Sequence, residues 1–219
     1  MSALSPEAPV RVPARDTYRH GDLRRALLDA GIELARGGGP EAVVLREATR
    51  RAGVAPNAAY RHFASRQDLL EAVRLAALSA MAQAMEKEVA AVRRARNSAA
   101  YARDCLGAVG AAYLRFAQEE RGLFRAGFAP AQPVELVRPN PQKAGPGGQN
   151  PFELLGSVLD RMVEAGVLPA SRRPGAEYLA WSAVHGLALL VIDGPLALMP
   201  PKELQAMSRR LLDMVEKGL

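Results

Sequence analysis

Apolar residues recur every three or four positions through most of this chain, which is the spacing of amphipathic helices. The first such run begins at Asp22 and puts Leu23, Leu27 and Leu34 on one face before the glycines at 37–39 end it. Few segments alternate apolar and polar residues with the period of two that strands show. The pattern therefore predicts an all-α fold.

Two short helices are expected before the next long one. The first covers 45–52, and the second begins at Pro56, because proline suits the first position of a helix. Ser65 and Asp68 resemble a capping box that starts a long helix running to about Val92. Two short helices joined by a turn with glycine are the layout of a helix-turn-helix motif.

The second half of the chain predicts four further helices, over about 98–118, 150–166, 176–192 and 202–216. The first two of them are separated by a segment, 129–150, that contains five prolines and three glycines. A loop of this length is unusual inside a compact domain. We expect it to be a lid or a mobile segment.

Composition limits the class of protein. The chain has 219 residues, enough for one large or two small domains, and its single cysteine, Cys105, excludes a disulfide within the chain. We expect Cys105 to be a buried helix residue, with redox sensing as the alternative. No apolar run approaches the length of a membrane span, and the Pro-rich start does not resemble a signal peptide. We therefore expect a cytoplasmic protein without a membrane partner.

Positive charge gathers around the two short helices. The formal net charge is +6, and between residues 42 and 67 five arginines face a single acid, Glu47. The guanidinium group matches phosphates and guanine edges, so this distribution favours a nucleic-acid partner more than the overall charge does.

The stretch "LREATRRAGVAPNAAYRHFASRQDLL" at 45–70 resembles the helix-turn-helix of the TetR family of bacterial transcriptional regulators. The shared features are the turn Ala52-Gly53-Val54, the Tyr60-x-His62-Phe63 end of the recognition helix, and Arg66. Further on, "WSAVHGLALL" resembles a TetR C-terminal domain named for a Trp-His-Gly motif, here Trp181, His185 and Gly186.

Residues 1–17 contain three prolines and no periodic pattern, so we expect a disordered basic arm there. The resemblance implies a helix-turn-helix DNA-binding domain at 18–65 and a ligand-binding and dimerisation domain at 66–219. The arm could touch DNA beside the main site, or it could be a plain tail.

The recognition helix starts with residues that reach base edges. Asn can pair with adenine, Arg with guanine, and Ala58 could meet a thymine methyl. We expect DNA-base contacts from Arg46, Pro56, Asn57, Ala58 and Arg61. The family pattern places Tyr60, His62 and Arg66 on phosphates. Phe63 is expected in the core, together with Val54 and Ala59. Val44 departs from the pattern, because many relatives have Ser or Thr there as helix cap and phosphate contact.

The scarce aromatic residues of the second half suggest an apolar cavity for a small-molecule ligand, although each could also be a plain core residue. The candidates for the ligand pocket are Tyr101, Tyr113, Phe116, Phe124, Phe128, Met162, Trp181 and His185. His185 is either a satisfied structural histidine or a hydrogen-bond donor to a ligand or a partner subunit.

The two final helices are expected to pair with their copies in a homodimer, as the family implies. The candidates for the dimer interface are Leu187, Leu190, Val191, Leu204, Met207, Leu211, Leu212 and Val215. The three histidines lie far apart, so we expect no metal site, and no cofactor motif is present.

The leading function is a homodimeric repressor that a small, partly apolar ligand releases from a palindromic double-stranded DNA operator. An activator or a ligand-independent DNA-binding regulator would use the same helix. A small helical enzyme is a remote alternative, because the sequence has no nucleophile–base pair and no phosphate-binding loop. We expect no enzymatic activity.

Overall fold

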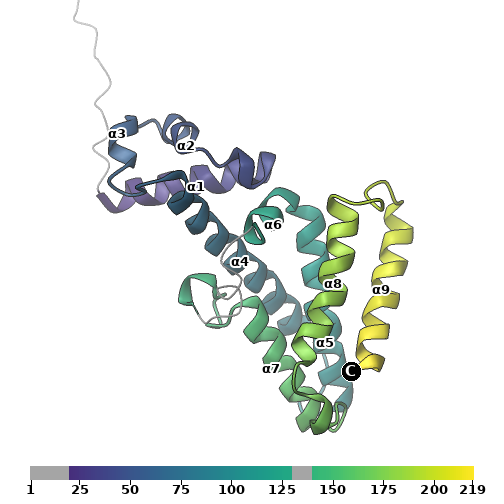
Figure 1. Cartoon of the computed structure of the whole chain (residues 1–219). Coiled ribbons are helices and arrows are strands. Elements are labelled where there is room, and N and C mark those ends of the chain that lie inside the picture. The colour runs from purple at the N-terminus through teal and green to yellow at the C-terminus, as the bar shows by residue number, and fades with distance from the viewer. Residues whose placement is uncertain (1–19, 130–139) are drawn as a thin grey trace, which may run out of the picture.

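The computed structural model describes residues 20–129 and 140–219, and within these ranges the chain forms helices and no strand. The proposed arm at 1–17 lies outside the described residues. Figure 1 shows the three N-terminal helices set apart from a larger helical bundle, with one long helix joining the two. The all-α prediction is confirmed.

The N-terminal unit consists of α1 (His20–Gly38), α2 (Leu45–Arg51) and α3 (Pro56–Ala59). Their shared core buries Leu27, Ala59 and Phe63 almost completely. One expectation needs correction here. The recognition helix was expected to include Tyr60, His62 and Phe63, but α3 is a single turn that ends at Ala59. From Tyr60 the chain continues as turns, in which the backbone N–H groups of His62 and Phe63 both bond to the carbonyl of Ala59.

Helix α4 (Arg66–Ala91) links the N-terminal unit to the rest of the molecule. The predicted capping box at its start is present: the Ser65 hydroxyl accepts from the Asp68 backbone, and the Asp68 carboxylate accepts from the Ser65 backbone. Its first turns bury Leu69 and Val73, which lie close to Gly31 of α1. At about 1.5 Å per residue, its 26 residues span about 39 Å.

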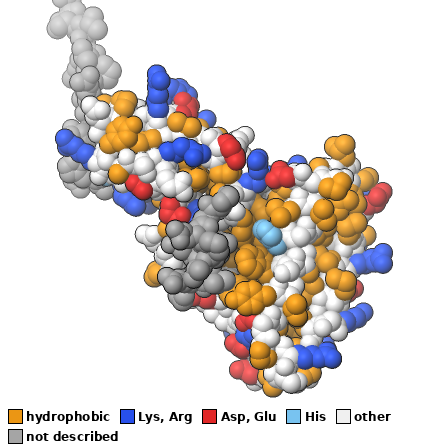
Figure 2. Space-filling model, viewed as in Figure 1, with side chains coloured by type: hydrophobic (Ala, Val, Ile, Leu, Met, Phe, Trp, Pro, Cys, Tyr) orange, Lys and Arg blue, Asp and Glu red, His pale blue; other side chains and the backbone are white. Residues whose placement is uncertain are grey.

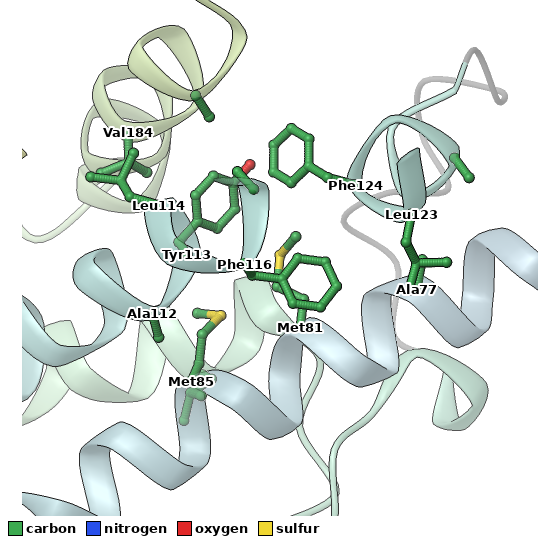
Figure 3. Packing of buried hydrophobic residues seen from close by; sticks show 14 of the residues in the cluster. Ala77, Met81, Met85, Ala112, Tyr113, Leu114, Phe116, Leu123, Phe124 and Val184 are labelled. Atoms are coloured by element: carbon green, nitrogen blue, oxygen red, sulfur yellow. The ribbon is translucent and has the colours of Figure 1, made fainter. Parts of the chain in front are cut away.

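The C-terminal unit packs around α4 and α5. It contains α5 (Ala99–Glu119), α6 (Arg121–Gly127), α7 (Pro151–Glu164), α8 (Ala176–Ile192) and α9 (Pro201–Gly218). In Figure 1, α8 and α9 run side by side along one edge of the bundle. Figure 3 shows the buried side chains between these helices, where Tyr113 of α5 faces Phe124 of α6. Cys105 is fully buried in this core, as expected.

The described part of the Pro/Gly-rich segment, 140–150, is attached to α4. The Ser79 hydroxyl donates to the carbonyl of Ala144, at 2.6 Å, and the Glu86 carboxylate accepts from the backbone N–H of Gly147. A short 3-10 turn at Pro141–Lys143 leads to Asn150, which caps α7. These residues therefore form a docked wall of the bundle, and residues 130–139 lie outside the described ranges.

Candidate functional sites

The single turn of α3 presents a polar surface to solvent. Pro56, Asn57 and Arg61 are exposed, and 57% of the Tyr60 surface is accessible. On the opposite side, the buried Ala59 and Phe63 hold the turn against α1 and α2. Pro56, Asn57, Tyr60 and Arg61 thus share one exposed turn, whereas Ala58 and His62 are half-buried. Arg46 and Arg66 are also exposed, at the starts of α2 and α4.

The arginines of this region differ in how their charge is balanced. Arg50 and Arg51 both pair with Glu47, and the hydrogen bonds from Arg50 lower the pKa of that carboxyl to about 2. Within the described part of the chain, the guanidinium groups of Arg46 and Arg61 form no ion pair. The positive charge of Arg46 and Arg61 is therefore uncompensated.

Arg66 has a structural contact in addition to its predicted role. Its guanidinium donates a 2.6 Å hydrogen bond to the carbonyl of Pro40, which ties the start of α4 to the turn that follows α1. An arginine has five N–H donors, so this bond leaves others for a phosphate. On the same unit, the Arg24 guanidinium lies 5.1 Å from the centre of the Phe63 ring.

Val44 is the N-cap residue of α2, and its side chain makes no capping hydrogen bond. The backbone there is extended, with φ −121° and ψ 127°, which is the conformation that a capping Ser or Thr adopts. The side chain is 42% exposed. The departure from the family pattern that the sequence showed therefore leaves an apolar group where a hydroxyl would fit.

A cavity of about 100 Å³ lies inside the C-terminal unit. One buried water needs about 10–15 Å³ on this scale, so the space suits a small ligand or part of a longer one. Its walls come from α4, α5, α7, α8, α9 and the 140–150 segment. Leu78 and Met85 of α4 form one side. Gly107 of α5 borders open space, since a Cβ there would meet nothing within 4 Å.

Three of the eight predicted pocket residues line this cavity: Tyr113, Phe128 and Trp181. The other five do not line it. Four of them are buried between helices and so do not face the cavity. Their exposed fractions are small: Tyr101 6%, Phe116 8%, Phe124 0% and Met162 1%. His185, the fifth, is held among aromatic rings, one of them the stacked ring of Phe124 at 5.7 Å.

Tyr113, Trp181 and His185 form a hydrogen-bonded group at the cavity wall. The Trp181 Nε1–H donates to the Tyr113 hydroxyl at 3.1 Å, and that hydroxyl lies 2.7 Å from His185 Nδ1. Burial raises the pKa of Tyr113, so its proton stays, and burial lowers the pKa of His185. The Tyr113 O–H therefore donates to a neutral imidazole, whose proton resides on Nε2.

Sequence reasoning missed the polar groups of the cavity. Lys143 and Asn150 line it on one side, and Asp213 and Glu216 line it on the side of α9. Lys143 and Asn150 are 2% and 1% exposed. The only sequence signal was the Asn150-Pro151 start of a helix, and that pattern predicts a cap rather than a binding group.

Helix α6 connects the N-terminal unit to the bundle. The Arg36 side chain of α1 donates to the Glu120 carboxylate at 2.9 Å. Arg125 lies 3.6 Å from Glu41, which follows α1, and 3.4 Å from Asp193, at the end of α8. These exposed pairs contribute little stability individually, but they place α6 between the two units.

Helices α8 and α9 present an apolar face to solvent, and Figure 2 shows hydrophobic side chains spread over them. Leu179 is 66% exposed, Leu190 44% and Met214 59%. Of the predicted interface residues, Leu190 and Met207 are exposed, and Leu211, Leu212 and Val215 are half-buried. Leu187, Val191 and Leu204 are buried in their own subunit, because they face the α8–α9 contact and the bundle.

In residues 20–129 and 140–219, no group of His, Cys, Asp and Glu is placed to hold a metal ion. In the same ranges, no helix is long and apolar enough to cross a membrane.

Comparison with known families agrees with this architecture. Residues 27–73 match the model of the bacterial regulatory proteins of the tetR family, and residues 106–215 match the tetracycline repressor-like C-terminal domain. The two models together cover the exposed α3 turn and most of the cavity wall. The chain belongs to the TetR family. It is therefore a DNA-binding transcriptional regulator.

Solved structures share the fold of this TetR family member over nearly its whole length. A protein of unknown function from Rhodococcus sp. RHA1 is 25% identical, with a TM-score of 0.71 over 94% of this chain and 99% of that one. The regulator FadR from Bacillus subtilis, in complex with stearoyl-CoA, is 14% identical, with a TM-score of 0.64 over 89% and 98%. PfmR from Thermus thermophilus is 22% identical, with a TM-score of 0.56 over 88% and 98%. No curated protein matches the chain in sequence.

Proposed function

We propose that this regulator is a homodimeric repressor, which leaves a palindromic operator when a small, mostly apolar molecule enters the cavity of its C-terminal unit. The observation that carries the proposal is the course of α4. Leu69 and Val73, near its start, pack in the core beside α1, whereas Leu78 and Met85 line the cavity. A ligand would touch the same helix that holds the DNA-reading unit.

The exposed turn at α3 supplies the reading surface. Asn57 and Arg61 reach base edges, with help from Arg46, Pro56 and Ala58, whereas Tyr60, His62 and Arg66 hold phosphates and set the register. The turn is short and carries two alanines, so much of the affinity for DNA comes from contacts to the phosphate backbone of the DNA. A two-fold dimer with one such turn on each subunit reads two half-sites at a fixed spacing.

The exposed face of α8 and α9 supports the dimer. Leu179, Ala183, Gly186 and Leu190 follow each other at helical spacing on α8, and none of them is buried. A Cβ on Gly186 would meet nothing within 4 Å in the single chain. A stripe of this kind lets a partner helix approach closely and hide its apolar side chains from water.

Ligand control requires two conformations of different ligand affinity. A ligand that fits the cavity only when α4 has shifted would favour the conformation whose two reading turns no longer match the operator. The coupling free energy equals the difference in ligand affinity between the two states. FadR, which shares the fold, was solved with stearoyl-CoA bound, so this architecture accommodates an acyl ligand in at least one protein.

The direct experiment is to select the operator from random duplex DNA and then titrate small molecules into the complex, followed by fluorescence anisotropy. The proposal expects a pseudo-palindromic site and loss of DNA affinity when a cavity ligand binds. A ligand that raises DNA affinity would favour the activator instead. Failure to select any sequence would contradict DNA reading by this turn.

The dimer has its own test. Leu190→Glu combined with Leu179→Glu places charge on the apolar stripe and should yield monomers in analytical ultracentrifugation. Val44→Glu, a change at an equally exposed apolar residue on the N-terminal unit, is the matched control and should leave the assembly intact. A double variant that sediments like the unchanged protein would exclude this face as the interface.

A further inference from the structure

The polar groups of the cavity are distributed unevenly. Most of its lining is apolar, with Leu, Val, Met and aromatic side chains. Lys143 and Asn150 contribute donors beside the start of α7, and Asp213 and Glu216 contribute acids near the end of α9. In Figure 1 the start of α7 and the end of α9 lie at opposite edges of the bundle. The donors and the acids of the lining thus come from different elements, and we call these two parts of the wall the donor end and the acidic end.

The amide orientation of Asn150 is fixed by its capping role. Its Oδ1 accepts from the backbone N–H groups of Phe152 and Glu153, at 2.9 and 3.0 Å, so the other amide atom must be Nδ2. In the described part of the chain, Nδ2 is buried and has no hydrogen-bond partner. A buried donor without an acceptor is costly, and a ligand acceptor would remove that cost.

Lys143 adds positive charge to the same wall. Its side chain is 2% exposed, in contrast to Lys87, Lys202 and Lys217, which lie toward the surface. An ammonium group has three N–H donors, so Lys143 can keep the partner that it already has and still donate to an anion in the cavity. On α7, the Glu153 carboxylate accepts from the Asn150 backbone N–H, which holds that acid in the helix cap.

The opposite end disfavours an anion. Glu216 pairs with Arg103 at 3.1 Å, which balances its charge, but the exposed Asp213 has no ion pair within the described ranges. A negatively charged head group is therefore disfavoured at the α9 end and finds hydrogen-bond donors at the α7 end. The apolar walls between the two suit an aliphatic chain.

We propose that the cavity binds an amphiphilic carboxylic acid, with its carboxylate against Asn150 Nδ2 and Lys143 and its aliphatic chain along α5 and α8. This assignment rests on the proposed ligand site and names the chemical class of its ligand. Phe152 and Trp181 flank the chain, and Gly107 leaves it room on the α5 side.

The same wall is connected to α4. The Ser79 hydroxyl donates to the carbonyl of Ala144, and the Glu86 carboxylate accepts from the backbone N–H of Gly147. The segment at 143–150 is therefore hydrogen-bonded to α4, the helix that reaches the DNA-reading unit. A carboxylate that draws Lys143 and Asn150 together would pull on these bonds. Head-group recognition therefore acts at the place where α4 can respond.

The test measures binding by isothermal titration calorimetry on the full chain without DNA. The probes are octanoic, decanoic and dodecanoic acid, each beside the primary alcohol of equal length, below their critical micelle concentrations. We expect an acid to bind at least about tenfold more tightly than its alcohol, because a charge-assisted hydrogen bond is lost with the carboxylate. Equal binding of both, or binding of neither, would overturn the proposal.

Three variants locate the head group. Asn150→Asp keeps the capping oxygen, so α7 should remain folded, but it replaces the donor with a negative charge; the acid should bind at least about tenfold more weakly. Lys143→Met keeps the aliphatic stem and should abolish the preference of acid over alcohol. Lys87→Met removes a lysine of α4 that does not line the cavity, and should change nothing. An acid preference that survives both cavity variants would overturn the assignment.

Operator release is measured separately, so the two proposals can fail independently. Tight acid binding that depends on Asn150 and Lys143 but leaves the operator complex intact would uphold the ligand class and contradict ligand-released repression. Release of DNA by apolar molecules, with equal potency in Lys143→Met, would uphold repression and overturn the carboxylate assignment.

Discussion

Gly122 of α6 lies directly against the backbone carbonyl of Ala35 in α1, and a Cβ on Gly122 would be only 2.1 Å from that oxygen. No side chain fits there without moving a backbone. Because Ala35 belongs to the DNA-reading unit and Gly122 to the bundle, the relative position of the two units depends on this absence of a side chain.

Gly122→Ala should therefore separate α6 from α1. Overpacking of this kind costs about 1–3 kcal/mol, and the displaced unit should change operator affinity even without ligand. Urea unfolding and DNA titration measure the two effects. Gly37→Ala is the matched control, since Gly37 is an exposed glycine of α1 at which a Cβ would meet nothing within 4 Å. Unchanged stability and affinity in Gly122→Ala would show that the contact does not position the units.

The two classes of arginine near α3 should behave differently. Arg61→Ala removes an unpaired guanidinium from the exposed turn and should cost about 1–3 kcal/mol on the selected operator, with relaxed base preference. Arg50→Ala removes one that Glu47 already balances, and should cost less and leave base preference unchanged. Selection on both variants measures the preference. Identical preference in wild type and Arg61→Ala would refute the assigned reading face.

Helix α2 has no side-chain cap at Val44, and a substitution there can add one. Val44→Thr introduces a hydroxyl where the backbone is already extended, and it should stabilise the protein by about 1 kcal/mol. The hydroxyl would also offer the phosphate contact of the family pattern, so DNA affinity should rise. Thermal unfolding checks the first effect. Val44→Ile, which keeps the branched shape without the hydroxyl, should show neither gain; if it matches Val44→Thr, capping is not the cause.

Stability should fall in mild acid through His185. Burial lowers the pKa of His185 below its ordinary value of 6.5, so the unfolded chain binds the proton first. The stability that neutral His185 contributes is fully present above the ordinary pKa value and is lost as the pH falls toward the pKa of the folded protein. Between about pH 7.5 and about pH 5.5, the melting temperature of His185→Gln should fall by less than that of the wild type. Parallel melting profiles would show that the Tyr113–His185 bond does not respond to protons.

Helix positions were predictable because their signals are local. The Ser65–Asp68 capping box and the Asn150-Pro151 start of α7 both follow from residues a few positions apart. The length of α3 was overestimated, since the turns after Ala59 contain no residue that excludes helix.

The cavity could not be predicted in the same way. Phe116 and Phe124 look like pocket residues in sequence, but packing between α4, α5 and α6 consumes them. Lys143 comes from a Pro/Gly-rich segment whose docking on α4 depends on Ser79 and Glu86, more than sixty residues away in sequence. Hydrophobic periodicity predicts helices but does not predict contacts between residues so far apart in the sequence.

The central claim, that ligand binding in the cavity lowers DNA affinity, is tested most directly by keeping the ligand out. Gly107→Leu projects a side chain into the open space beside α5, which should exclude ligand while leaving the α3 turn intact. The measurement is the affinity of this variant for the selected operator, with and without a ligand that releases the wild-type protein. We expect the variant to remain on the operator at ligand concentrations that release wild type. Equal release of the variant would contradict the account.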